Sequence, residues 1–364
     1  MTRAEEIGIK RERVRGFLRE QGLDGVLMTQ QSSFSWYTGG GSGFVALASV
    51  EGSGTILAMK DRDVLITDNI EAPRLEAEEM GGFGFEVASF PWHRSEERAK
   101  VLDRLSGGKR IATDVELRDA FRRLRYVLTE REIERYRALG RDTGASLAEV
   151  CRKIRLGESE FQIAGRLSER LFAKGITPIV LLVAADDRVR KFRHPIPTSK
   201  QVTQYAMIVV CGRREGLIVS TTRLVHFGDL SPELRRRHDS VVRVDGAFIA
   251  HTRPGSEVRE VFEKAVQAYR AEGFEDEWQL HHQGGGTGYE PRDFKGTLDC
   301  SEIVQEHQAY AWNPSITGTK SEDTILVGPE GFEVLSETAD WPMVVVEVGG
   351  QTIARPDILV RSSW

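Results

Sequence analysis

Residues Ala311 to Thr324 read Ala-Trp-Asn-Pro-Ser-Ile-Thr-Gly-Thr-Lys-Ser-Glu-Asp-Thr. This stretch contains two polar pairs, Asn313-Pro314 and Glu322-Asp323, and only the second pair carries carboxylates. An Asn side chain is a neutral amide, so it cannot bridge two divalent cations as an ionised carboxylate does. Glu322 is therefore the first candidate for a catalytic or metal-binding residue, and the other residues of the site decide whether a metal can bind there.

Length and charge exclude several classes of protein. A chain of 364 residues with ample apolar content can bury a core in two domains or in one large one. The formal charge of −5 comes from 50 basic and 55 acidic residues, which leaves no basic field for nucleic acid. We therefore expect a folded protein that does not bind nucleic acid.

The cysteines and the N-terminal segment bear on location. The three cysteines are odd in number and form no CxxC pair, which argues against a disulfide framework or a structural zinc and suits a reducing cytoplasm. The segment from Met1 to Arg19 is charged throughout, and no apolar run is long enough to span a bilayer. These patterns predict an unprocessed cytoplasmic protein that does not interact with membranes.

Hydrophobic periodicity predicts an α/β fold with a domain boundary near Leu128. Before it, we expect helices at 4–21 and 71–80 and strands at 26–29, 44–48, 54–59, 63–66 and 110–113. After it, we expect helices at 129–156, 161–173 and 257–271 and strands at 179–184, 205–211, 216–222, 242–249, 324–327 and 343–348.

Four short motifs, in a fixed order, resemble the creatinase or pita-bread family, which includes aminopeptidase P and prolidase. They are Arg193-His194-Pro195, Ser220-Thr221-Thr222-Arg223, Gly284-Gly285-Gly286-Thr287-Gly288-Tyr289 and Lys320-Ser321-Glu322-Asp323-Thr324. Residues 22–39 are similar to the start of that family's N-terminal domain. The resemblance implies an α+β architecture, with a creatinase-like N-terminal α/β domain over residues 1–128 and a pita-bread domain over residues 129–364.

In the family, two Asp, one His and two Glu bind a pair of metal ions, and most of these positions differ here. The matching positions hold Val210 or Cys211, Ser220, Gly285, Asn313 and Glu322, so only the last keeps a metal ligand. One carboxylate cannot offset the dehydration of two divalent cations. We therefore predict neither a bound metal pair nor another cofactor, and a turn with room where the family's ligand His is lost.

The resemblance also implies metal-free chemistry, because creatinase shares this fold and uses a His as acid and base. His194 matches that His and is predicted to transfer protons, with Glu322 beside it as a second catalytic group that orients substrate or activates water. The alternative for His194 is a loop residue hydrogen-bonded to backbone.

Seven further residues are candidates for substrate binding, and most have a structural alternative. Arg292 stands where the peptidases have a His and, with Arg223, suggests a carboxylate-bearing substrate; alternatively, Arg292 forms a surface salt bridge. His281 and His282 precede the triple-glycine turn as adjacent strand residues, so one of them at most is expected to face the pocket; alternatively, both merely flank the turn. The remaining candidates are Asn313, Ser220 and Tyr37, and the last either caps the pocket or belongs to the core with Trp36.

Three functions remain open. The first is a metal-independent hydrolase or lyase that acts on a C–N bond of a small amino-acid-like, guanidino or amide substrate. The second is a catalytically silent pita-bread domain that binds a peptide or protein. The third is an Xaa-Pro aminopeptidase or dipeptidase with an atypical metal site. The resemblance further implies a homodimer.

Overall fold

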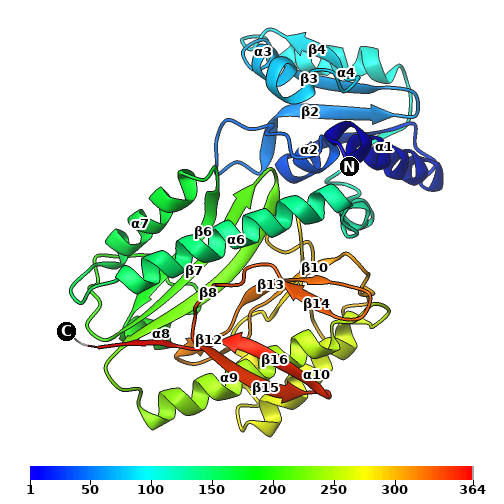
Figure 1. Ribbon diagram of the computed structural model, residues 1–364. Coiled ribbons are helices and arrows are strands. Elements are labelled where there is room, and N and C mark those ends of the chain that lie inside the picture. Colours follow the sequence, from blue (N-terminus) through cyan, green and yellow to red (C-terminus); the bar gives the residue numbers. More distant parts are fainter. Residues whose placement is uncertain (363–364) are drawn as a thin grey trace. The chain divides into compact units, whose positions relative to one another are not determined.

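The computed structural model describes residues 1–362, which divide into two compact units. The first comprises Met1–Glu132 with Glu215–Leu217, and the second comprises Ile133–Arg214 with the rest of the chain from Ile218. The division falls four residues beyond Leu128, where the sequence suggested a boundary. Figure 1 shows the units coloured along the sequence. Among the described residues, every helix is too short or too polar to cross a membrane.

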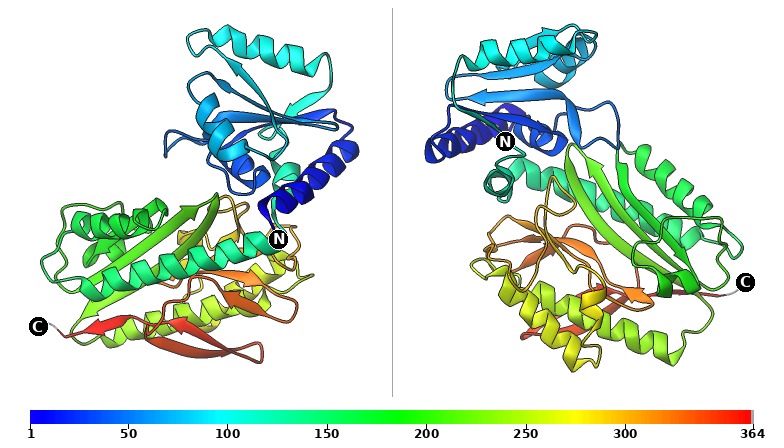
Figure 2. Two further views of the ribbon diagram at one scale, coloured as in Figure 1. Left: turned by 45° about the horizontal axis from the view of Figure 1, so that its top comes forward. Right: turned by 180° about the vertical axis from the view of Figure 1, so that it is seen from behind.

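The first unit is built on a five-stranded mixed sheet with the order β4-β3-β2-β1-β5. Its strands are β1 (Gly25–Gln30), β2 (Glu51–Met59), β3 (Asp63–Asp68), β4 (Glu86–Phe90) and β5 (Ile111–Thr113). Its helical elements are α1 (Arg3–Glu20), α2 (Gln31–Tyr37), α3 (Ala72–Arg74), η1 (Leu75–Met80), α4 (Ser95–Ser106), α5 (Arg118–Arg122) and η2 (Arg123–Arg125). Figure 2 shows α4 on one side of this sheet and α1 and α2 on the other.

The second unit contains two four-stranded sheets, ordered β17-β8-β7-β6 and β14-β13-β10-β9, and two short ribbons, β11-β12 and β15-β16. The first sheet consists of β6 (Thr177–Ala185), β7 (Tyr205–Arg214), β8 (Leu217–Phe227) and β17 (Leu359–Arg361). The second consists of β9 (Gly284–Thr287), β10 (Ala309–Trp312), β13 (Asp323–Val327) and β14 (Phe332–Val334). The ribbons are β11 (Ser315–Ile316), β12 (Thr319–Lys320), β15 (Met343–Val348) and β16 (Gln351–Pro356).

The helical elements of this part of the chain are α6 (Glu130–Lys153), α7 (Glu160–Phe172), α8 (Asp187–Lys191), α9 (Pro232–His251), α10 (Val258–Ala271) and η3 (Glu277–Leu280). Their apolar faces pack on the sheets and on one another, and the ring of Phe248 from α9 stacks on Trp312 of β10 at 4.4 Å between centroids. Such packing fixes β10, and with it the start of the 311–324 stretch, in the core.

Two predicted strands are wrong. Residues 242–249 lie inside α9, whose N-terminus is set by the Ser231 hydroxyl accepting from the Leu234 amide and by Pro232 in the first turn. This segment of α9 is buried almost all round, which produces a continuous apolar run that looks like a buried strand. Residues 44–48 form no strand and leave Val45 exposed.

Candidate functional site

Five segments of the second unit bring the motif residues together around Glu322, which lies between β12 and β13. The Glu322 carboxylate is buried and accepts a hydrogen bond from the Thr222 hydroxyl at 2.6 Å. The Lys320 ammonium lies 2.9 Å from its Oε2, and an Nη atom of Arg292 lies 3.1 Å from its Oε1. Two cationic side chains therefore flank the carboxylate that the sequence motifs match to the last of the family's metal ligands.

These cations set the charge state of Glu322. Burial alone would raise the pKa of this carboxyl, but the Lys320 ammonium, the Arg292 guanidinium and the Thr222 hydroxyl together hold the pKa at about 2. Glu322 is consequently ionised at neutral pH. Arg292 and Lys320 together carry one positive charge more than Glu322 neutralises.

The catalytic role predicted for Glu322 is not supported by this geometry. Both carboxylate oxygens have close partners, and only 2% of the residue is exposed. A carboxylate so enclosed cannot reach a substrate or a water molecule without losing those contacts. In the structure it pairs with Lys320 and Arg292, and its catalytic role stays a prediction.

Arg292 lies at the site, as the sequence suggested, and is not in a surface salt bridge. Its guanidinium donates to the Ser220 hydroxyl at 3.3 Å as well as to Glu322. Ser220 in turn lies 3.2 Å from the Cys211 sulfur, with both atoms buried between β7 and β8. Ser220, which the motifs match to one family metal ligand, thus contacts Cys211, one of the two candidates for the position of another.

Gly285, which the resemblance matches to the family's ligand His, leaves no room for a side chain. An added Cβ would lie 2.2 Å from the backbone oxygen of Phe294 and 2.8 Å from the nitrogen of Gly296. The backbone φ of +150° is one that residues with a side chain rarely adopt. The predicted vacancy is therefore wrong, because the neighbouring backbone has closed against this turn.

Three imidazoles form a cluster near Glu322. The Nε2 atoms of His194 and His281 lie 3.1 Å apart, and the rings of His281 and His282 stack at 4.4 Å. Both His281 and His282 lie close to His194, against the expectation that at most one would face the site. They occupy the segment between η3 and β9, so the alternation of a regular strand does not apply to them.

The histidines are neutral at pH 7. Burial, with the nearby Lys320 ammonium, lowers the pKa of His281 to about 2; burial, with the Arg292 guanidinium, lowers that of His282 to about 4. Partial burial and Lys320 also lower the pKa of His194 below 6.5. His194 is the exposed member of the cluster, so it can accept a proton from a group that arrives from solvent.

The imidazoles also raise the question of a single metal ion. Their ligand atoms lie within 4.8 Å of one another, a spacing that one ion could bridge. However, a ligating His normally donates its second nitrogen to an acceptor, and the Nδ1 atoms of His281 and His282 are buried without a hydrogen-bond partner among residues 1–362. The excess positive charge of Arg292 and Lys320 opposes a cation further, so this arrangement does not fit a metal well.

The structure places Arg223 and Tyr37 in buried contacts with other side chains. The Arg223 guanidinium is buried and pairs with Asp323 at 3.0 Å. Asp323 also pairs with Arg355, so the network is structural. Tyr37 is 1% exposed in the first unit and donates to Asp63 at 2.7 Å, which makes it a core residue.

Asn313 remains at the end of β10, buried in the second unit. Its backbone amide donates to the Gln283 carbonyl at 3.0 Å, and its Oδ1 is without a hydrogen-bond partner within residues 1–362. Lys320, which sequence reasoning did not single out, is the more informative neighbour. A cation two residues before Glu322 was a visible signal, because residues i and i+2 of an extended chain face the same side.

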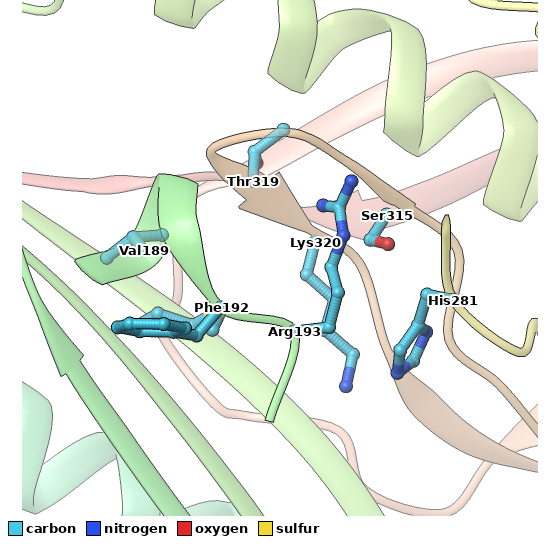
Figure 3. A pocket seen from close by; sticks show the side chains of 8 residues that line it. Val189, Phe192, Arg193, His281, Ser315, Thr319 and Lys320 are labelled. Carbon is cyan, nitrogen blue, oxygen red and sulfur yellow. The ribbon is translucent and has the colours of Figure 1, made fainter. Parts of the chain in front are cut away.

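A small, partly open hollow adjoins this cluster (Figure 3). Its lining consists of Val189, Phe192, Arg193, Met207, His281, Ser315, Thr319 and Lys320. Arg193 is engaged by Glu277 at 2.7 Å and by the Thr317 hydroxyl at 3.0 Å. Lys320 and His281 thus connect the hollow to the Glu322 cluster.

Comparison with known proteins defines the class. Residues 134–329 match metallopeptidase family M24, and residues 10–140 match the creatinase/prolidase N-terminal domain. The chain belongs to the M24 family, as its motifs indicated, and has the predicted N-terminal creatinase-like domain and pita-bread domain.

Individual relatives are distant in sequence but similar in fold. An uncharacterized peptidase of Staphylococcus aureus, MW1651, is 22% identical over 237 residues, which cover 61% of this chain and 65% of that protein, just under two thirds of its length. The uncharacterized peptidase YqhT of Bacillus subtilis is 21% identical over 91% of this chain and 98% of its own. The structure of an Xaa-Pro dipeptidase from Bacillus anthracis superposes with a TM-score of 0.77 at 20% identity, covering 98% of this chain and 100% of that one.

Proposed function

We propose that this protein cleaves a C–N bond of a small, carboxylate-bearing, amino-acid-like substrate without the metal pair of its family, and that His194 serves as general acid and base. The observation that carries the proposal is the enclosure of Glu322 by Lys320 and Arg292. The Lys320 ammonium and the Arg292 guanidinium lie beside the Glu322 carboxylate. A pair of metal ions would need anionic side chains at these places instead.

The metal pair does not fit the residues present. At the matching positions, Ser220 and Asn313 are neutral, and the Gly285 turn cannot accept a side chain without backbone movement. A divalent ion beside Glu322 would also meet the positive charges of Arg292 and Lys320. The chemistry is therefore assigned to side chains.

In the proposed hydrolysis, neutral His194 accepts a proton from water while the oxygen attacks the carbon of the scissile C–N bond. Negative charge develops on the carbonyl-type oxygen and is stabilised by the Arg292 guanidinium, which lies beside Glu322. When the C–N bond breaks, the His194 imidazolium returns its proton to the leaving nitrogen. The 3.1 Å contact with His281 holds the His194 ring in place throughout.

The test measures turnover by the purified protein in the presence of a strong chelator. Three substrate classes are offered, namely N-acyl amino acids, guanidino acids and Xaa-Pro dipeptides, and products are identified by mass spectrometry. His194→Ala should lower kcat by a factor of about 10² to 10⁴, the usual contribution of a general base. The matched control is His93→Ala, since His93 is an exposed histidine in the first unit.

Each outcome distinguishes the functions. Turnover that survives chelation and requires His194 supports the proposal. Cleavage of Xaa-Pro dipeptides only after addition of Mn²⁺ or Zn²⁺ would favour the peptidase with an atypical metal site. Absence of turnover in all three classes, with carboxylate binding intact, would favour the silent binding domain.

A further inference from the structure

The hollow beside Glu322 has two chemically different sides. Val189, Phe192 and Met207 line it with apolar side chains, and Lys320, Ser315 and His281 bring polar groups. Figure 3 shows Val189 and Phe192 on one side of the hollow and Lys320, Ser315 and His281 on the other. The enclosed part of the hollow has room for about one water molecule, and the rest of its empty space opens to solvent, so a ligand group would bind at the open side.

The Lys320 ammonium has unused hydrogen-bonding capacity. An ammonium carries three N–H donors. Within residues 1–362, its one close acceptor is Glu322, although only 5% of the Lys320 side chain is exposed. A buried donor without a partner is costly, which favours an acceptor arriving with a ligand.

Ser315 provides an independent indication at the same place. Its hydroxyl is buried and without a hydrogen-bond partner in the described part of the chain, and the residue is 3% exposed. Ser315 and Lys320 also face each other in register across the β11-β12 ribbon. Two underused donors therefore sit on neighbouring strands at the edge of one hollow.

The charge around the hollow selects the type of acceptor. Arg193 is neutralised by Glu277 at 2.7 Å, and Glu322 neutralises only one of Arg292 and Lys320. The remaining positive charge favours an anion over a neutral group or a cation. A carboxylate also offers the two oxygens that an ammonium and a hydroxyl can share.

We propose that this hollow is a substrate subsite for a carboxylate joined to a short apolar group, in which Lys320 and Ser315 bind the carboxylate and Val189, Phe192 and Met207 contact the apolar part. The inference rests on the proposed function only in calling the ligand a substrate. It narrows the substrate class to amino-acid-like molecules with an aliphatic side chain. His194 does not line the hollow itself, but its Nε2 atom lies 3.1 Å from that of His281, which does.

The experiment uses three probes that contain no C–N bond, so that binding is measured apart from turnover. The probes are 4-methylpentanoate, acetate and 4-methylpentan-1-ol, and their affinities are measured by ligand-observed NMR with the full chain. We expect 4-methylpentanoate to bind at least tenfold more tightly than either of the others. Equal affinity for the acid and the alcohol, or for the acid and acetate, would overturn the proposal.

Variants separate the two ends of the subsite. Lys320→Met should remove the preference for the acid over the alcohol, and Phe192→Ser should reduce the preference for 4-methylpentanoate over acetate. Phe192 is 47% exposed, so its replacement should not unfold the chain, and Phe161→Ser, at an exposed phenylalanine on α7, is the matched control.

If Lys320→Met fails to fold, Ser315→Ala gives the second measurement and should weaken acid binding several-fold. Unchanged preferences in the folded Lys320→Met, Ser315→Ala and Phe192→Ser variants would refute the subsite. If the binding pattern holds while His194→Ala leaves turnover intact, the subsite stands and the proposed catalytic mechanism fails.

Discussion

Replacing Lys320 by Met tests the electrostatic design of the site. The side chain is 5% exposed and its ammonium lies 2.9 Å from Glu322, so Met preserves most of the buried stem and removes the charge. Glu322 would then rely on Arg292 and Thr222 alone against a burial that disfavours its ionised form. We expect the variant to be less stable at pH 7.

The magnitude follows from the pKa of Glu322. A carboxyl with a pKa of about 2 in the folded protein, against 4.5 as its ordinary value, gains about 3 kcal/mol of folding stability at neutral pH. Because the folded pKa is lowered, this stability is present above pH 4.5 and is lost as the pH falls towards 2. Among the groups that lower the pKa of Glu322, Lys320 has the largest effect. Its removal should therefore lower the free energy of unfolding by about 2–3 kcal/mol at pH 7 and by less at pH 3.

Urea unfolding followed by tryptophan fluorescence measures the free energy, and hydrogen exchange of β13 amides assigns the change to the second unit. The control is Lys191→Met, since Lys191 pairs with Asp187 at the surface and should contribute less than about 1 kcal/mol. The double variant with Glu322→Gln should recover part of the loss, because an amide needs no counter-cation. A loss below about 1 kcal/mol, or one independent of pH, would refute the reasoning.

Three further outcomes can be measured by the same unfolding assay. Arg223→Met should lower the free energy of unfolding by about 3–5 kcal/mol, because the buried Asp323 carboxylate would lose one of its cationic partners. Gly285→Ala should destabilise the protein by about 1–3 kcal/mol, because the added Cβ would overlap neighbouring backbone atoms. The control, Gly165→Ala, adds its Cβ in open space on α7 and should be neutral or stabilising. Equal effects of the two changes would contradict the closed turn. The wild type should lose stability relative to His281→Gln as the pH falls from 6.5 to 4. In this range the unfolded chain binds a proton at His281, whereas the folded chain, in which the pKa of His281 is lowered, does not. Parallel pH profiles of the two proteins would count against a neutral His281.

Periodicity predicted a long helix with one apolar stripe and short strands that are buried on both faces. The charged stretch after Leu128 has a single apolar stripe and is α6, and the alternating or short apolar runs at 54–59 and 205–211 lie in β2 and β7. It failed at 242–249, where burial on all sides of α9 erases the helical period. The deciding signal there was the Ser231-Pro232 start, ten residues upstream of the misread run.

The site was partly predictable because its motifs keep their order along the chain. Sequence reasoning placed His194, Ser220, Arg292 and Glu322 at one centre, and the structure brings them into one region. It could not tell which cations pair with which acids. Arg223 and Arg292 looked alike as candidates, and only the packing around β8 assigns one to the Asp323 network and the other to Glu322.

Side-chain cations and metal ions can stabilise the same negative charge, but they constrain a site differently. A guanidinium and an ammonium donate hydrogen bonds in directions fixed by their stems, whereas a bound ion also generates hydroxide from water by lowering its pKa. With Arg292 and Lys320 beside Glu322, the proposed reaction has hydrogen-bond donors for a developing oxyanion but must obtain its nucleophile by proton removal. That requirement falls on His194, the exposed member of a neutral imidazole cluster, so proton transfer there should govern the rate.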